Sequence, residues 1–191
     1  MKKIILGLIL FFVSTFNTSA DIQRIFYGNL NAKISIIVYE SLTCSHCASF
    51  HKDVFPKLKK DYLDTGLAKI EFRHYPLDIA AFNASKISQC HQSKGLEILE
   101  SLYSNQQAWV KGETIDEVNK NLKVFIEKAG FNINFEKCIN DKKIEDFVLN
   151  DRIEGAKKFK INATPTIIIN NEKFEKSLKY KNLKKSLEKL I

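Results

Sequence analysis

Proline, glycine and long apolar runs are all scarce in this sequence of 191 residues. With only three prolines and seven glycines, the chain cannot be collagen-like. Hydrophobic residues make up 45% and charged residues 27% of the chain, which is close to the average for soluble domains. These proportions exclude an intrinsically disordered chain and a coiled coil, and they predict a globular fold.

Only one apolar run stands out, the ten residues from Ile4 to Val13. It has about half of the ~20 residues that a membrane-spanning helix needs. Two lysines precede it, and Thr18-Ser19-Ala20 follows it as a small-x-small cleavage site. This arrangement predicts a cleaved signal peptide over residues 1–20, export to the periplasm and a soluble mature chain.

Arginine is also rare, with only Arg24, Arg73 and Arg152. The formal net charge is +8, and removal of Lys2 and Lys3 with the signal peptide lowers it to +6. A scattered set of lysines is typical of a solvated surface rather than of nucleic-acid recognition, which relies on arginine. We therefore expect no nucleic-acid partner, and weak attraction to anionic membranes or acidic proteins is the alternative.

The first half of the chain alternates between strand and helix patterns. Residues 34–39 form a β-branched run of strand length that we expect to be buried on both faces. A helical pattern from Cys47 to Tyr62 follows, with a kink expected at Pro56, and a second strand covers 68–74. Strand, helix and strand together predict a right-handed parallel crossover unit.

From residue 78 to 155 only helical patterns occur, among them a capping box at Thr114 and Glu117. A short buried strand at 166–169, a hairpin partner near 173–174 and an amphipathic helix at 178–191 complete the chain. The pattern predicts an α/β fold with an all-helical insertion. We expect a signal peptide over residues 1–20 and a helical insertion over 78–155. The α/β domain is expected to be discontinuous and to consist of residues 21–77 and 156–191.

Cysteine is used sparingly, and two of the four cysteines form the motif Cys44-Ser45-His46-Cys47 between the first strand and its helix. A helix N-terminus stabilises an anion, so we expect a lowered pKa at Cys44 and a less exposed Cys47. Two cysteines at this spacing can cycle between dithiol and disulfide. Half of a zinc site or an inert disulfide are the alternatives, but there is no second CxxC to complete a zinc site.

The cysteine motif, the helical insertion and the segment Ala163-Thr164-Pro165-Thr166 resemble the DsbA-like branch of the thioredoxin superfamily. The resemblance covers nearly all of the mature chain. It implies a thioredoxin fold with an inserted helical domain, a nucleophile at Cys44, a resolving cysteine at Cys47, and a cis Pro165 that faces them after Thr164. We expect Thr164 and Pro165 to bind substrate.

A member of this family would donate the Cys44–Cys47 disulfide to folding exported proteins that contain reduced cysteines. No metal or separate cofactor is expected, because the redox group is the cysteine pair itself. The resemblance also implies a membrane reoxidase as partner, and we expect a monomer. His46 is expected to help lower the Cys44 pKa to about 4, which would stabilise the dithiol form by roughly 4 kcal/mol and favour a disulfide donor.

Two other functions stay open at this point. Ser45 departs from the proline common in disulfide donors, and threonine at position 164 also occurs in isomerases, so a disulfide isomerase or reductase is one alternative. Against an isomerase, only about a dozen residues separate Asp21 from the first predicted strand, so we expect no N-terminal dimerisation domain. A copper-binding module on the same fold, with Cys44, Cys47 and a histidine as ligands, is the other alternative. Methionines of the mature chain would be expected to help such a role, but the only methionine is Met1, within the predicted signal peptide.

Cys90 and Cys138 each lie on an apolar face of a predicted helix, and in an oxidising compartment we expect them to form a structural disulfide. Two separately buried free thiols are the alternative. Near the motif, Glu40 is expected to be a solvated strand end, although a role as proton acceptor for Cys47 is also considered. His51 is expected to be a packed helix residue.

Overall fold

A five-stranded mixed sheet forms the centre of the protein in the computed structural model, which describes residues 22–91 and 93–191. The predicted signal peptide, residues 1–20, lies outside the described residues. The strand order is β1-β3-β2-β4-β5, in which β2 and β3 are parallel and the other pairs antiparallel. The strands are β1 Ile25–Gly28, β2 Ile34–Glu40, β3 Ala68–His74, β4 Thr166–Ile169 and β5 Glu172–Lys173.

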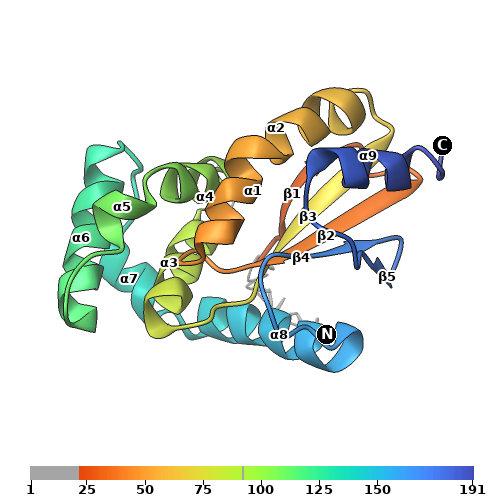
Figure 1. Cartoon of the computed structure of the whole chain (residues 1–191). Helices are drawn as coiled ribbons and strands as arrows, with labels where there is room; N and C mark the ends of the chain where they lie inside the picture. The colour runs from red at the N-terminus through yellow and green to blue at the C-terminus, as the bar shows by residue number, and fades with distance from the viewer. Residues whose placement is uncertain (1–21, 92) are drawn as a thin grey trace, which may run out of the picture.

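Helices cover both faces of the sheet and one of its ends (Figure 1). On one face lie α1 Ser45–Asp53, α2 Phe55–Leu58, the π-helical turn η1 Lys59–Leu63 and α9 Tyr180–Leu187, and on the other lies α8 Lys142–Phe159. The end of the sheet where β2 and β3 finish is covered by α3 Ile79–Cys90, α4 Gly95–Ser104, α5 Gln106–Trp109, α6 Ile115–Lys128 and α7 Phe135–Asn140. This arrangement confirms the predicted α/β fold with a helical insertion.

The two faces of the sheet follow from the alternation of side chains along β2. Ile34, Ile36 and Val38 point into the main core beneath α1 and α4, whereas Tyr39 belongs to a smaller core beneath α8. Gly155 of α8 lies against Tyr39 so closely that a Cβ atom there would come within 2.7 Å of the tyrosine ring. Both faces of β2 are therefore covered, as its β-branched sequence predicts.

The structure departs from the sequence patterns at three places. The edge strand β1 is not predicted by them, because only four residues pair with β3. The helix expected over 47–62 is interrupted at Val54, two residues before Pro56, which lies in the first turn of α2. The last helix ends sooner than expected, at Leu187.

The insertion begins with α3, directly after β3, and the capping box at Thr114 and Glu117 is confirmed at the start of α6. Helix α8 runs across the predicted domain boundary at 155/156, because its second half packs on the sheet. The exact domain division stays a prediction. None of the helices in the described part of the chain is both long and apolar enough to cross a membrane.

Candidate active site

Cys44 is the N-cap residue of α1, at the point where β2 ends and the chain turns into the helix. Its backbone is extended, its N–H donates to the Ser41 carbonyl (3.0 Å), and its carbonyl accepts the first helical hydrogen bond from Ala48 (3.1 Å). No side chain caps this helix end and its first turn contains no acidic residue. The unpaired N–H groups of the first turn are therefore available to an anion at Cys44.

The two sulfurs of the motif are not bonded to each other in the structure, and their environments differ. A hydrogen bond from the Cys47 thiol is the main reason that the pKa of Cys44 falls to about 5. Thr164 and the backbone N–H groups of Cys47 and His46 act in the same direction, while partial burial opposes them. The lowered pKa means that Cys44 is a thiolate at neutral pH.

Cys47 has the opposite character, because it lies one helical turn deeper and is 0% exposed. Burial raises the pKa of Cys47 strongly, and the hydrogen bond to Cys44 and the charge of Glu40 raise it further. The pair therefore combines an accessible anionic sulfur with a buried protonated one. The two environments differ in the direction that the motif predicts, and the roles of nucleophile for Cys44 and resolving cysteine for Cys47 stay a prediction.

The segment before β4 forms the opposite wall of the site. The Thr164-Pro165 peptide bond is cis, and Sγ of Cys44 lies 3.4 Å from the Thr164 carbonyl oxygen, which accepts a hydrogen bond from the thiol when Cys44 is protonated. The hydroxyl of Thr166 donates to the Ala163 carbonyl at 2.7 Å, which holds the turn closed. The structure thus brings Thr164 and Pro165 to Cys44 across a gap of 120 positions in the sequence.

His46 is exposed on the first turn of α1, where it borders a groove of about 380 Å³. Residues of α1, α2, the segment before α9 and the start of α9 line this groove, among them Phe50, Lys57, Leu178 and Tyr180. The contribution of His46 to the Cys44 pKa that the structure shows comes from its backbone N–H. A role for the imidazole ring stays a prediction.

The prediction that Glu40 is a solvated strand end is wrong, because this residue is only 2% exposed. A hydrogen bond of 2.8 Å joins its Oε2 to Nε2 of His51, which is also buried. His51 is packed, as expected, and its ring stacks on Tyr103 of α4 with centroids 4.3 Å apart. The second Glu40 oxygen, His51 Nδ1 and the Tyr103 hydroxyl have no hydrogen-bond partner among the described residues. A buried polar cluster therefore lies beneath Cys47.

Gln106 is a second residue at the site that the sequence analysis does not identify. Its side-chain amide donates to the carbonyls of Leu42 (2.6 Å) and Cys44 (3.1 Å). Neither Gln106 nor Tyr103 belongs to a sequence motif, and both are brought to the site by packing of the insertion against α1. No local pattern in the sequence could have revealed them.

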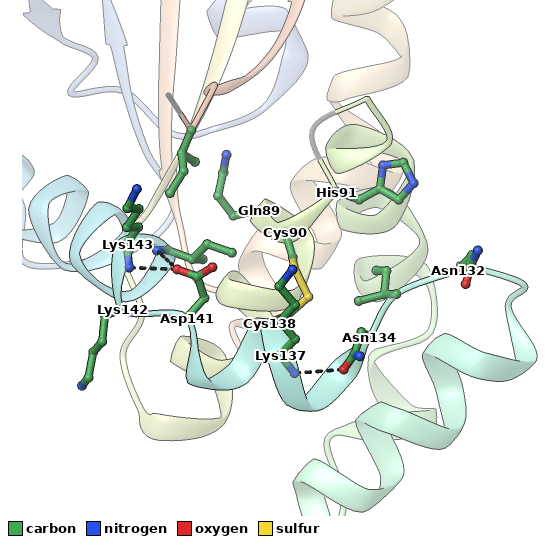
Figure 2. A pocket seen from close by; sticks show the side chains of 13 residues that line it. Gln89, Cys90, His91, Asn132, Asn134, Lys137, Cys138, Asp141, Lys142 and Lys143 are labelled. Carbon is green, nitrogen blue, oxygen red and sulfur yellow. Dashed lines mark hydrogen bonds between the residues drawn. A yellow bond between two sulfur atoms is a disulfide. The ribbon is translucent and has the colours of Figure 1, made fainter. Parts of the chain in front are cut away.

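The other two cysteines lie in the insertion, where a disulfide joins Cys90 at the end of α3 to Cys138 of α7. Figure 2 shows this bond in the wall of a cavity of about 590 Å³ lined by residues of α3, α7 and the start of α8. The cavity shares no lining residue with the groove beside His46. Across the described ranges, no three His, Cys, Asp or Glu side chains gather in a way that could hold a metal ion.

Comparisons with known proteins agree with this geometry. Residues 20–189 match the family model described as thioredoxin. The crystal structure of alpha-DsbA1 from Wolbachia pipientis superposes with a TM-score of 0.78 at 31% sequence identity and covers 86% of this chain and 89% of that one. BdbD from Bacillus subtilis, in its oxidised form, has a TM-score of 0.70 at 20% identity over 87% of this chain and 92% of its own, which shows a shared fold.

A "putative protein-disulfide oxidoreductase" of Rickettsia bellii is 26% identical over 169 residues, which is 85% of this chain and 64% of the relative. Similar proteins from Rickettsia prowazekii and Rickettsia typhi are matched over 60% and 55% of their length. The chain therefore spans less than two thirds of these curated relatives.

Proposed function

The chain belongs to the thioredoxin family, in its DsbA-like branch, and on this basis we propose that it is an exported protein thiol-disulfide oxidoreductase that donates disulfides to folding proteins. One observation carries the proposal: Cys44 is at the N-terminus of α1 with a pKa lowered to about 5, directly opposite the cis Thr164-Pro165 bond. The redox group is the cysteine pair itself.

The reaction proceeds by two thiol-disulfide exchanges. A substrate thiolate attacks Cys44 of the Cys44–Cys47 disulfide, the bond between the two cysteines breaks, and Cys47 leaves as a thiolate that takes up a proton. A second substrate thiolate then attacks the substrate sulfur of the mixed disulfide and releases Cys44 as a thiolate. The substrate loses two electrons and gains a disulfide, while the Cys44–Cys47 pair is reduced.

The acidity of Cys44 supports this direction of transfer. A sulfur with a low pKa is a good leaving group, so the mixed disulfide resolves toward oxidised substrate and a free Cys44 thiolate. Each pKa unit below the ambient pH favours the reduced form of the pair by about tenfold. The reduced form is thus the stable one, and the oxidised form acts as a disulfide donor.

The buried cluster beneath Cys47 supports a route for the proton. Because burial raises the pKa of Cys47, its thiolate must be protonated when it leaves and deprotonated when the pair is reoxidised. In this proposal the hydrogen-bonded Glu40 and His51 supply and accept that proton. Glu40 is close enough for its charge to raise the pKa of Cys47.

Substrate is bound by the turn that contains the cis proline. The Thr164 backbone N–H and C=O pair with an extended segment of the substrate, which is strand addition and gives affinity without strict sequence choice. We expect a broad range of exported proteins with reduced cysteines as substrates and, by family, a membrane protein that reoxidises the pair. The signal-peptide pattern of residues 1–20 supports export to the periplasm.

The direct test mixes the oxidised protein with a reduced peptide that contains two cysteines. We expect one peptide disulfide to form for each Cys44–Cys47 disulfide that is lost, and a potential above about −200 mV against glutathione. A lower potential, together with faster reshuffling of a scrambled disulfide protein, would instead support the isomerase or reductase function that Thr164 leaves open. A peptide that stays reduced would contradict the proposal.

A further inference from the structure

The turn between β2 and α1, residues 41–44, is held from outside by the start of the insertion. On one side the Thr43 hydroxyl donates to Asp78 (2.7 Å), and the Leu77 N–H donates to the Ser41 hydroxyl (3.3 Å). Asp78 in turn caps α3 by accepting from the Ala81 N–H at 2.7 Å. Leu42 and Cys44, the other two residues of the turn, make no hydrogen bond to Leu77 or Asp78.

The carbonyls of Leu42 and Cys44 are both bound by the single side-chain amide of Gln106. For the buried Leu42 carbonyl this amide is the one hydrogen-bond partner found within residues 22–91 and 93–191. A buried carbonyl without a partner is costly, so without Gln106 the turn would relax toward water. The short distance to Leu42, 2.6 Å, fits a bond that the turn depends on.

Gln106 is itself held firmly in place. It starts α5, whose Trp109 is fully buried and donates from its indole N–H to the Leu102 carbonyl at 3.0 Å. The Gln106 carbonyl accepts from the Val110 N–H at 2.8 Å. In Figure 1, α5 lies with α4 and α6 in the helical layer beyond the end of the sheet where α1 begins. The amide therefore reaches the turn from a rigid part of the insertion.

We propose that Gln106 is a positioning residue for the redox site, because its amide holds the Leu42 and Cys44 carbonyls and so keeps the N–H groups of the first turn of α1 aimed at the Cys44 sulfur. This inference rests on the proposed function of Cys44 as the nucleophile. Gln106 touches no reacting atom, and it acts through the backbone of Cys44.

The effect of Gln106 should differ between the two redox states. In the oxidised protein the Cys44–Cys47 bond fixes the Cys44 sulfur covalently, whereas in the dithiol only the turn and its hydrogen bonds do so. Loss of the Gln106 amide should therefore weaken the stabilisation of the thiolate and destabilise the reduced form more than the oxidised form. We expect a higher Cys44 pKa and a weaker oxidant.

Charge does not complicate this expectation. The titratable groups near the turn are Cys47 and His46 of α1, Tyr103 of α4, Glu40 of β2 and Asp78 before α3. Gln106 is neutral, and a methionine in its place has a similar length, no charge and no donor. A change in the Cys44 pKa of this variant would therefore reflect the position of the sulfur and not a change in the charges around it.

The experiment compares Gln106→Met with Gln107→Met, because Gln107 is the adjacent glutamine, is exposed and makes no hydrogen bond to the turn. The thiolate absorbance of the reduced proteins is titrated against pH, and their equilibrium constants with glutathione are measured. For Gln106→Met we expect the Cys44 pKa to rise by about one unit and the equilibrium constant to shift about tenfold toward the oxidised protein. Gln107→Met should match the unaltered protein.

Identical titrations of Gln106→Met and the unaltered protein would overturn the inference, even if the variant melts at a lower temperature. Should Gln106→Met fail to fold, Gln106→Asn, which keeps an amide one methylene shorter, is judged by the same criterion. An ordinary Cys44 pKa in the unaltered protein would contradict the proposed function itself, so the two failures are distinguishable.

Discussion

The first cysteines of the two pairs lie at opposite ends of their helices. Cys44 caps the N-terminus of α1, where free N–H groups favour an anion, whereas Cys90 is the last residue of α3, where the helix dipole disfavours one. Cys47 follows Cys44 on the same helix, but Cys138 lies on a different helix from Cys90, 48 positions away. The difference leads us to propose that the position of a sulfur on its helix distinguishes a pair that exchanges disulfides from a pair that is structural.

Burial alone does not separate the two pairs, because each combines one partly exposed cysteine, Cys44 or Cys90, with one buried cysteine. The sulfur of Cys44 is partly exposed and faces the Thr164 carbonyl, so a substrate can reach it. Cys138 is only 1% exposed and is packed in the main core. A thiolate that attacked the insertion disulfide would release a sulfur that has no helix N-terminus to stabilise it, unlike the sulfur of Cys44. We therefore propose exchange chemistry for the first pair and a structural role for the second.

The largest effects that separate the pairs should come from serine substitutions at the motif. Cys44→Ser removes the attacked sulfur, and we expect it to abolish oxidation of a dithiol peptide. Cys47→Ser cannot form the Cys44–Cys47 disulfide, so it should not oxidise the dithiol peptide. Mixed with a peptide that contains a disulfide, its Cys44 thiolate should form a mixed disulfide that persists on non-reducing gels, because no Cys47 thiolate is present to displace the peptide. Full turnover by Cys47→Ser would reverse the assigned roles.

The double substitution Cys90→Ala with Cys138→Ala should have the opposite profile. The disulfide closes a loop between positions 48 apart, for which the chain-entropy model gives about 4 kcal/mol of unfolding free energy as an upper figure. Denaturant unfolding should show a loss of stability up to this size, while peptide oxidation stays close to that of the unaltered protein. Loss of oxidation by the folded double variant would break the comparison.

The pH dependence of reduction by glutathione should also be characteristic of the Cys44–Cys47 pair. The folded pKa of Cys44, about 5, lies below its ordinary value of 9.0, so the stabilisation of the dithiol form is complete above the ordinary value and is lost as the pH falls toward 5. The equilibrium constant for reduction of Cys44–Cys47 by glutathione should rise about tenfold per pH unit between about 5 and 8.5. A constant value across this range would show that no thiolate is stabilised.

Pro165→Ala tests the wall opposite Cys44. We expect the fold to persist, because Pro165 lies outside the sheet, and release of mixed disulfides to slow by roughly tenfold, because the substrate segment is no longer held in line for the second attack. Stopped-flow kinetics with a dithiol peptide measure this step. Release at the rate of the unaltered protein would remove the proline from the mechanism.

The smallest expected effect is that of the His46 side chain. Its backbone N–H already contributes to the Cys44 pKa and survives substitution. His46→Leu should therefore raise the Cys44 pKa by only about half a unit, the size of a typical charge or dipole effect at a helix end, and weaken the oxidant correspondingly. An unchanged thiolate titration would limit the contribution of His46 to its backbone.

Sequence reasoning succeeds where the information is local. The junction of a buried strand and a helix with cysteines two residues apart predicts the site, and the β-branched run before it predicts the central strand. It fails for Glu40, because a carboxylate at a strand end looks solvated until the packing that buries it is known, whereas the packed position of His51 is predicted correctly. Gln106 and the Leu42 carbonyl are 64 positions apart, and only the tertiary fold of the insertion brings them together.

The edge strand β1 is not predicted from the sequence for a different reason. Four residues are too few to establish a strand period, and the strand exists only because β3 offers it an edge. Gly28 permits the contact, since its φ of +104° and a Cβ distance of 2.7 Å to the Ala68 carbonyl exclude larger residues. Such a requirement is visible in the structure and not in the composition of the segment.

The most direct test of the central claim is to reduce both pairs in one experiment. The fully oxidised protein is equilibrated with glutathione buffers of graded ratio, free thiols are alkylated, and each cysteine is quantified by mass spectrometry. We predict that Cys44–Cys47 opens in mildly oxidising buffer, at a potential above about −200 mV, while Cys90–Cys138 stays bonded as long as the protein is folded. Opening of both pairs at one potential, or of Cys90–Cys138 first, would contradict the account.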